Sequence, residues 1–106
     1  MALFRRKGRV RPGTTRTASS QDLEHLSRFA AERTGVEAYI EPRTAVTETT
    51  VVLVAGDGEW TRRRVPGPQA AVDFARERAM PLYDATLVGY PQRMRDWTAR
   101  HKQQRG

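Results

Sequence analysis

The sequence predicts an α+β fold, in the form of a two-layer sandwich in which helices cover one face of an antiparallel sheet of three to four strands. Segments with apolar residues at every third or fourth position are typical of amphipathic helices. Between them lie short segments of alternating or β-branched residues bounded by turn signals, which are typical of strands. In chain order these segments give α-β-β-β-α-β-α. Tight turns between consecutive strands favour antiparallel pairing.

Residues 20–34 are predicted to form the first helix. Ser20 is the expected N-cap, and Asp22 and Glu24 follow in the first turn, where carboxylates interact favourably with the helix dipole. The apolar face of this helix consists of Leu23, Leu26, Phe29 and Ala30. Gly35 is expected to end the helix in a left-handed conformation.

Three strands are expected next. Residues 36–42 alternate between apolar and polar side chains, and residues 46–55 are rich in the β-branched residues that suit a strand. Residues 59–65 return after Asp57-Gly58, which is a strong hairpin signal. The register stays open, because a two-residue loop and a three-residue loop place Trp60 on opposite faces relative to Leu53.

The second half of the chain predicts two more helices and a fourth strand. The segment Pro66-Gly67-Pro68 interrupts the sheet, and residues 69–80 have the pattern of a helix. Residues 85–88 are apolar and are predicted to form the fourth strand. A last helix is expected over residues 92–103, with Pro91 at its start. Its apolar stripe consists of Met94, Trp97 and His101.

The chain has 106 residues and a formal net charge of +7, and its basic residues are concentrated at the two ends. Residues 1–16 carry +6, residues 17–90 carry −3 and residues 91–106 carry +4. Residues 1–19 have little apolar content and are predicted to be a disordered basic tail. Residues 20–104 are predicted to form a single domain that includes a basic C-terminal helix. Attraction to a polyanion is therefore expected mostly from the ends.

Several function classes have no support in the sequence. The absence of cysteine excludes disulfides, thiolate zinc sites and cysteine nucleophiles, and no dinucleotide, nucleophile-elbow or metal motif occurs. His25 and His101 are expected to be surface or half-buried residues rather than catalytic bases. We therefore predict no enzymatic activity, no cofactor and no metal site. No apolar run reaches the roughly 18 to 20 residues of a membrane span, and no signal peptide is evident, so a cytoplasmic location is expected.

Arginines surround an aromatic residue in the predicted third strand. Trp60, Arg62 and Arg64 share one face of this strand, and Arg63 faces the other way. If the first face is open, Tyr39 joins it, and such a surface resembles the stacking platforms that hold single-stranded nucleic acid. The alternative is an edge strand that its charges protect from aggregation, with arginines covering the indole and pairing with glutamates of neighbouring strands.

A second dense stretch, residues 89–97, combines large apolar side chains with flanking arginines. The apolar side chains are Tyr90, Met94 and Trp97, and the arginines are Arg93 and Arg95. Aromatic residues with arginine are typical of interface anchors, so this helix is a candidate for docking into the groove of a partner. The alternative is that its apolar stripe packs on the core of its own domain.

Together these patterns predict a small non-enzymatic binding module. The candidate binding surface consists of Tyr39, Trp60, Arg62, Arg63, Arg64, Arg93, Arg95 and Trp97. Nucleic acid or a ribonucleoprotein is slightly favoured as the partner, because the two chain ends are basic. The alternative is a protein–protein adaptor that binds an acidic protein through Trp60 and the Tyr90, Met94 and Trp97 surface.

Three segments carry a resemblance to a known family. The stretches VEAYIEP, VTETTVVLVAGDGEWTRRR and VGYPQRMRDW resemble a family of short uncharacterised actinobacterial proteins, some of which are labelled oxidoreductase. The resemblance covers roughly residues 20–100 and implies a cytoplasmic protein of a high-GC bacterium with no established activity. The chain contains no cysteine pair and no flavin or nicotinamide fingerprint that would support an oxidoreductase.

A second resemblance concerns the order of the elements. Residues 21–79 follow the order α-β-β-β-α, which resembles a double-stranded-RNA-binding domain. That family grips phosphates with a lysine-rich start of its second helix. At the matching positions, residues 66–70, this chain has no lysine, and Arg62 to Arg64 come a few residues earlier on the strand.

Overall fold

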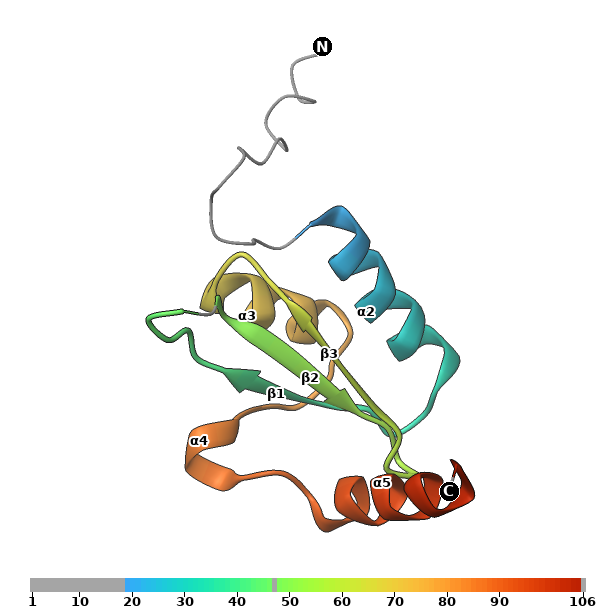
Figure 1. Cartoon of the computed structure of the whole chain (residues 1–106). Coiled ribbons are helices and arrows are strands. Elements are labelled where there is room, and N and C mark those ends of the chain that lie inside the picture. Colours follow the sequence, from blue (N-terminus) through green and yellow to red (C-terminus); the bar gives the residue numbers. More distant parts are fainter. Residues whose placement is uncertain (1–18, 47, 106) are drawn as a thin grey trace.

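The computed structural model describes residues 19–46 and 48–105, with side chains up to residue 102 (Figure 1). Its helices are α2 (Ser20–Glu32), α3 (Pro68–Glu77), α4 (Ala85–Val88) and α5 (Gln92–Arg105), and its strands are β1 (Glu37–Glu41), β2 (Thr50–Val54), β3 (Trp60–Arg64) and β4 (Leu82–Asp84). The predicted α+β class is confirmed. Apart from Ser19, the segment predicted to be a disordered tail, residues 1–19, lies outside the described residues.

The four strands form one sheet in the order β3-β2-β1-β4. Strands β1, β2 and β3 pair antiparallel, as predicted, whereas β4 pairs parallel to β1. The parallel pairing arises because α3 carries the chain from one edge of the sheet to the other, and a crossover of this kind brings the next strand in with the same direction. The sheet is therefore mixed, with β3 and β4 at its two edges.

The apolar core lies between the sheet and helices α2 and α3, which cover the same face (Figure 1). Leu26 and Phe29 of α2 and Phe74 of α3 pack on Val51 and Leu53 of β2. Burying a side chain of this size contributes roughly 1.5–3 kcal/mol. The sheet and these two helices together form the two-layer sandwich that the helical periodicity and the β-branched strand predict.

Helix α2 begins one residue earlier than predicted. Ser19, not Ser20, is the N-cap: its hydroxyl accepts a hydrogen bond from the Asp22 amide, and the Asp22 carboxylate accepts one from the Ser19 amide at 3.0 Å. This reciprocal capping box satisfies two amides of the first turn. Gly35 is left-handed, as predicted, with φ +67°, but the helix already ends at Glu32 and Gly35 forms the turn into β1.

The hairpin between β2 and β3 has a three-residue loop, which settles the register that the sequence leaves open. Trp60 pairs with Val54, and the amide of Ala55 donates to the carbonyl of Glu59 at 2.8 Å. Gly58 takes φ +99°, a conformation that favours glycine. Because of this register, Trp60 lies on the face of the sheet opposite to Leu53 and the main core.

The strand predicted over residues 85–88 is wrong. The strand is β4, three residues earlier, and Ala85–Val88 is the short helix α4. The side chain of Asp84 causes this change, because it accepts hydrogen bonds from the amide and the hydroxyl of Thr86 and so caps a helical turn. The apolar residues Leu87 and Val88 of this turn are exposed rather than paired in the sheet.

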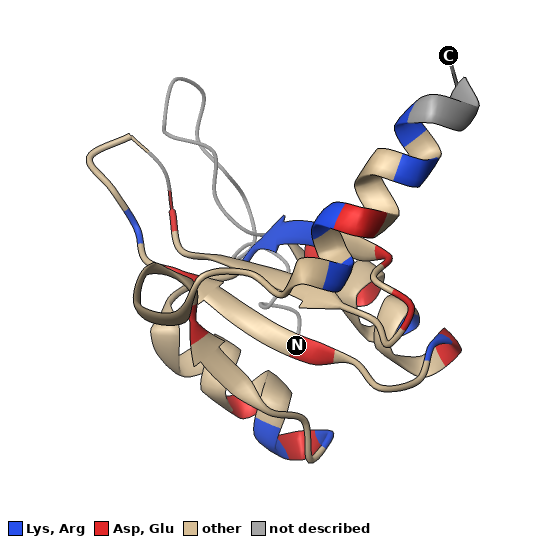
Figure 2. Cartoon of the chain, turned by 90° about the horizontal axis from the view of Figure 1, so that it is seen from below, with Lys and Arg blue, Asp and Glu red and all other residues tan. Residues whose placement is uncertain are grey.

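Helix α5 lies on the face of the sheet opposite to α2 and α3, and its C-terminal half projects away from the body of the domain (Figure 2). Met94, near the start of the helix, is buried against Tyr39, Val52 and Val54. For Met94, this contact agrees with the alternative interpretation, in which the stripe of the last helix packs on its own domain. Among the residues that the structure describes, no helix has the length and apolar character needed to cross a membrane.

Candidate nucleic-acid interface

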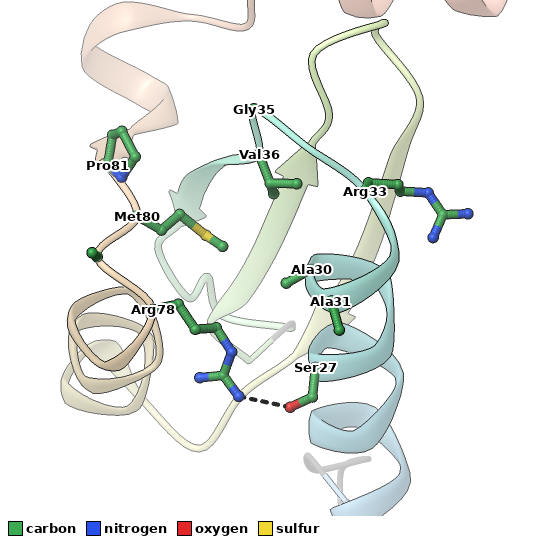
Figure 3. Close-up of a pocket in the computed structure, with 10 residues that line it drawn as sticks. Ser27, Ala30, Ala31, Arg33, Gly35, Val36, Arg78, Met80 and Pro81 are labelled. Carbon is green, nitrogen blue, oxygen red and sulfur yellow. Dashed lines mark hydrogen bonds between the residues drawn. The ribbon is translucent and has the colours of Figure 1, made fainter.

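A cavity lies on the α2 side of the sheet (Figure 3). It has a volume of about 650 Å³ and lies between α2 and the link from α3 to β4. The Arg78 guanidinium spans part of it, donating to the Ser27 hydroxyl at 2.9 Å and lying 3.8 Å from the centre of the Phe74 ring. Arg78 therefore joins the two helices, and its charge is already engaged within the fold.

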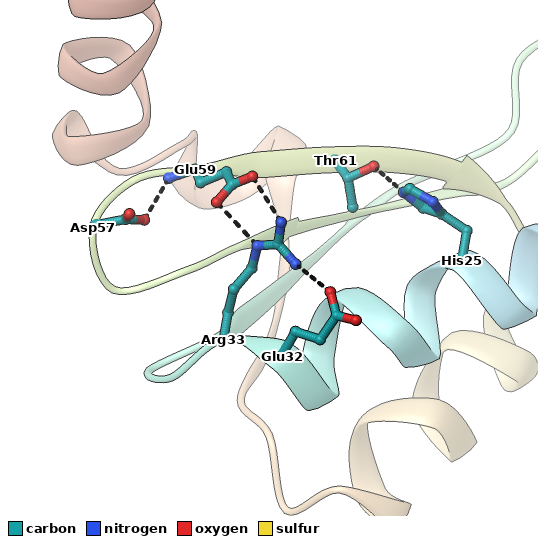
Figure 4. Close-up of polar contacts among 6 residues, drawn as sticks. All are labelled: His25, Glu32, Arg33, Asp57, Glu59 and Thr61. Carbon is teal, nitrogen blue, oxygen red and sulfur yellow. Dashed lines mark hydrogen bonds and ion pairs between the residues drawn. The ribbon is translucent and has the colours of Figure 1, made fainter.

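The second arginine of this cavity, Arg33, is also held by the domain itself (Figure 4). Its guanidinium donates to both carboxylate oxygens of Glu59, at 3.0 and 2.8 Å, and so joins the end of α2 to the start of β3. About two helical turns earlier on α2, His25 lies 2.6 Å from the Thr61 hydroxyl, and burial together with Arg63 lowers its pKa. These contacts hold α2 against the sheet and leave few polar groups of the cavity available to a ligand.

The opposite face of the sheet carries the aromatic and arginine residues that the sequence singles out. The register places Tyr39 of β1, Val52 of β2 and Arg62 of β3 in one row across the sheet. Trp60 and Arg64 lie on this face with Arg62, and Arg63 lies on the other, as the strand period predicts. The face is not an open platform, because Met94 of α5 covers Tyr39 and Val52.

Arg62 is paired with a carboxylate and packs on the indole of Trp60. It donates to both oxygens of Glu41 at 2.8 and 2.9 Å, and its guanidinium lies 5.4 Å from the centre of the Trp60 ring. Burial alone would raise the pKa of Glu41, but hydrogen bonds from Arg62, Thr50 and Tyr90 lower it to about 2. The indole N–H of Trp60 donates to the Thr98 hydroxyl of α5 at 2.8 Å. The side chains of Arg62 and Trp60 therefore make contacts that stabilise the fold.

The remaining strand arginines point in different directions. Arg63 faces α2, with its Nε 3.6 Å from a carboxylate oxygen of Asp22. Arg64 is half-buried at the end of β3. The structure therefore does not bring the three consecutive arginines together on one surface, which agrees more closely with the interpretation of a charged edge strand.

Arg93 fixes the start of α5 to the sheet. Its guanidinium donates to the carbonyl of Ala55 at 2.9 Å and to Glu37 at 2.8 Å, and the Tyr39 hydroxyl donates to the same Glu37 oxygen at 3.0 Å. The hydrogen bond from Arg93 lowers the pKa of Glu37, whereas burial and the bond to Glu37 raise the pKa of Tyr39 to about 12. Gly58 has no room for a side chain here, since a Cβ would lie 2.1 Å from the carbonyl oxygen of Arg93.

Three further basic residues of α5 are exposed. Arg95, Arg100 and Lys102 have exposed side chains, and among the described residues none of them forms an ion pair with a carboxylate. Arg95 donates to Gln92 at 3.2 Å, and Arg100 reaches the carbonyl of Asp57 at 3.4 Å. Their positive charges are therefore accessible to an anion, whereas the charges of Arg62 and Arg93 are paired with glutamates.

Trp97 of α5 lies at the junction between this helix and the β2–β3 hairpin. It is half-buried, its Cβ lies beside Gly58, and its ring stacks on His101 with a centroid separation of 3.7 Å. The ring nitrogen Nδ1 of His101 lies 2.8 Å from the carbonyl of Trp97. Trp97 therefore helps to hold the helix on the hairpin.

Two concave features lie along α5 and beside the segment that precedes it. The first, which we call the α5 groove, has a volume of about 360 Å³ and is lined by Tyr90, Met94, Arg95, Thr98, Ala99 and Lys102. The second, which we call the tyrosine pocket, has a volume of about 260 Å³ and is lined by Glu37, Tyr39, Tyr83, Val88, Gly89, Tyr90 and Pro91. Tyr90 is common to both, so the two features are neighbours.

The sequence interpretation does not include Tyr83 or Lys102 in its candidate surface. Tyr83 reaches the tyrosine pocket only because β4 pairs with β1, which places it directly beside Tyr39. The available signal was the pair of tyrosines that flank the apolar segment before Pro91. For Lys102 the signal was its spacing of seven from Arg95, about two helical turns.

Comparison of the chain with protein-family models, with curated proteins and with solved structures found no match. Within residues 19–46 and 48–105, no group of three or more histidine, aspartate or glutamate side chains is arranged to hold a metal ion. The assignment of a function therefore depends on the geometry and charge of the α5 groove and its surroundings.

Proposed function

We propose that this protein is a small binding module that contacts the phosphate backbone of nucleic acid through α5 and the basic chain ends. The observation that carries this proposal is the difference between two sets of basic residues. Arg62 and Arg93 are neutralised by glutamates of β1, whereas Arg95, Arg100 and Lys102 of α5 are exposed and have no carboxylate partner among the described residues. Arginine and lysine side chains of this kind are the usual ligands of phosphates.

The position of α5 supports the proposal. Its C-terminal half projects from the domain, so a long polyanion can approach it without meeting the acidic parts of the sheet and of α2 (Figure 2). Asp96 is the one acidic residue in the last sixteen positions of the chain, and its carboxylate accepts a hydrogen bond from Gln92. The N-terminal residues 1–16 add a further charge of +6 to the chain.

The proposed contact is electrostatic and does not use the strand arginines as a stacking platform. Arg62 and Trp60 are held by Glu41 and Thr98, so a ligand would have to break two hydrogen-bonded contacts of the fold to reach them. Phosphate contacts position a nucleic acid without reading its sequence. The expected activity is therefore binding with weak sequence preference and strong dependence on salt.

The test compares two charge variants of the full chain that have the same net charge. One carries Arg95→Gln, Arg100→Gln and Lys102→Gln on α5. The control carries Arg28→Gln, Arg43→Gln and Arg76→Gln, three exposed positions on α2, the β1–β2 loop and α3. Binding to labelled RNA and DNA of 12 nucleotides is measured by fluorescence anisotropy between 50 and 200 mM salt.

The α5 variant should bind more weakly than the control at every salt concentration. The slope of log affinity against log salt is negative, and each lost phosphate contact makes it shallower by about 0.7 to 0.9. The slope of the α5 variant should therefore be shallower than that of the native chain by about 2 to 3. The control should keep the slope of the native chain. Equal affinities and slopes for the two variants would mean that any binding depends on overall charge alone, and a native chain that binds no nucleic acid would overturn the proposal.

A further inference from the structure

The tyrosine pocket has an unusual composition for a surface cavity of this size. Three of its walls are tyrosine rings: the ring of Tyr39 forms a buried part of it, and the rings of Tyr83 and Tyr90 lie with their centroids 5.3 and 5.7 Å from that of Tyr39. Tyr83 is 39% exposed, so its ring is accessible from solvent. The two outer rings belong to β4 and to the segment before α5, which are brought together by the sheet.

We infer that the tyrosine pocket receives an unpaired base of a single-stranded nucleic acid, an inference that rests on the proposed function. Flat aromatic rings at the surface offer stacking area to a base, and stacking on aromatic side chains is how proteins hold unpaired bases without reading their sequence. The ring of Tyr83 packs at a tilt of 32° on the buried ring of Tyr39, so Tyr39 supports the exposed ring of Tyr83 on which a base can stack. A volume of about 260 Å³ is sufficient for one base and not for a folded partner element.

The polar lining of the pocket is compatible with a base. Glu37 is the one charged residue that lines it, and its carboxylate is paired with Arg93 at 2.8 Å. The pair leaves little net charge to repel a nearby phosphate. The carboxylate also remains an acceptor of the kind that binds the amino group of a base.

The connection between the pocket and the α5 groove gives the strand a path. Tyr90 lines both, so the two features are neighbours, and a strand with a base in the pocket can place its adjoining phosphates near the groove. Arg95 and Lys102 line the groove and are seven positions apart, which places them on the same side of α5 and about 10 Å from each other along its axis. The charge of the groove therefore complements the backbone, and the pocket complements the base.

The inferred ligand is single-stranded because only an unpaired base is free to enter the pocket. The bases of a duplex are stacked and paired, and inserting one into a pocket requires that it first be taken out of the stack. A duplex can reach the cations of α5 but leaves the tyrosine pocket empty. The same chain should therefore hold single strands more tightly than duplexes at equal salt.

The experiment uses the full chain and one exposed ring. Tyr83→Ala removes an outer wall of the pocket, and Tyr83→Phe keeps the ring and removes the hydroxyl. Anisotropy is measured for each protein with a labelled 12-nucleotide RNA, with the duplex of the same sequence, and with a single strand that has the same phosphates but lacks its bases. The abasic strand is measured on the native chain, so this result does not depend on the folding of a variant.

Tyr83→Ala should weaken single-strand binding by about five- to 150-fold, the range observed when a stacking residue is removed, and leave duplex binding within twofold. Tyr83→Phe should bind single strands as the native chain does, and the abasic strand should bind the native chain no better than the duplex. Unchanged single-strand binding by a folded Tyr83→Ala, or equal binding of abasic and intact strands, overturns the inference while the contact through α5 stands. The side chain of a protein partner would then be the better occupant. If the native chain binds no strand of either kind, the inference falls together with the proposed function.

Discussion

One face of the sheet is buried by α2 and α3 through a large apolar core, whereas the opposite face combines a smaller apolar cluster under the start of α5 with a polar network. On the first face, Leu26 of α2 packs in one cluster with Val51 and Leu53 of β2, and all three side chains are fully buried. On the second, Glu37 and Glu41 each bind an arginine and a tyrosine. We infer from this difference that the first face supplies most of the folding stability, while the second face positions α5 and the concave features beside it.

The largest difference is expected from truncating one buried side chain on each face. Leu53→Ala should lower the free energy of unfolding by about 2–5 kcal/mol, because Leu53 is fully buried in the core under α2 and α3. Met94→Ala should cost less, because Met94 is 8% exposed at the edge of the second face and α5 can shift toward the space. Urea unfolding followed by circular dichroism measures both. A cost for Met94→Ala equal to that of Leu53→Ala would show that the two faces contribute alike.

The sequence predicts the first face better than the second for a physical reason. The helical period of α2, the β-branched run of β2 and the Asp57-Gly58 turn are local signals, and each of them folds as its own residues prefer. The charge-rich edge strand was also foreseeable, because strand period alone separates Arg63 from Arg62. What the local signals leave out is which elements meet across long stretches of chain.

The second face depends on such long-range meetings. The tyrosine pocket requires β4 to pair parallel with β1 after a crossover through α3, and no residue near Tyr83 encodes that partner. The end of β4 is also set by a local competition, in which the capping side chain of Asp84 turns an apolar segment into α4. The binding role of Tyr39, Trp60, Arg62, Arg63, Arg64, Arg93, Arg95 and Trp97 stays a prediction, and only Arg95 of these has an exposed, unneutralised charge on the α5 groove.

Gly58→Ala is expected to destabilise the protein to an intermediate extent, by disturbing the contact of α5 with the second face. A Cβ at this position would lie 2.1 Å from the carbonyl oxygen of Arg93 and 2.9 Å from Cβ of Trp97, so α5 must move away from the hairpin. The left-handed backbone adds about 1–2 kcal/mol for any residue with a Cβ. Gly67→Ala is the matched control, because a Cβ there meets nothing within 4 Å.

The readout for Gly58→Ala exploits the position of both tryptophans of the chain. Trp60 and Trp97 each contact the junction of α5 with the hairpin, so tryptophan emission reports on the second face, whereas circular dichroism reports mainly on the whole fold. The variant should shift the emission to longer wavelength in buffer while its far-ultraviolet spectrum stays close to that of the native chain. Gly67→Ala should change neither signal, and unchanged emission for Gly58→Ala would mean that α5 is not held at this junction.

The smallest effect concerns acid, to which the second face should be more sensitive than the first. The pKa of Glu41 is about 2, below its ordinary value of 4.5, because Arg62, Thr50 and Tyr90 donate hydrogen bonds to the carboxylate. A lowered pKa in the folded state means that the stabilisation is complete above pH 4.5 and is lost progressively as the pH falls toward 2. Replacement by Gln should therefore cost about 1–2 kcal/mol at neutral pH and progressively less in acid.

Glu41→Gln is compared with Glu24→Gln, which removes the same charge from an exposed position of α2. Urea unfolding at pH 7, 4.5 and 3 gives the difference between each variant and the native chain. For Glu24→Gln this difference should be near zero at each pH, since an exposed charge without a partner changes stability by a few tenths of a kcal/mol at most. For Glu41→Gln it should shrink from pH 4.5 to pH 3, because the Glu41 carboxyl of the unfolded native chain, with its ordinary pKa of 4.5, is then protonated while the folded carboxylate stays ionised, which favours unfolding. A difference that is the same at all three pH values would mean that the amide costs stability by its fit alone, and that the network of β1 does not hold the second face through charge.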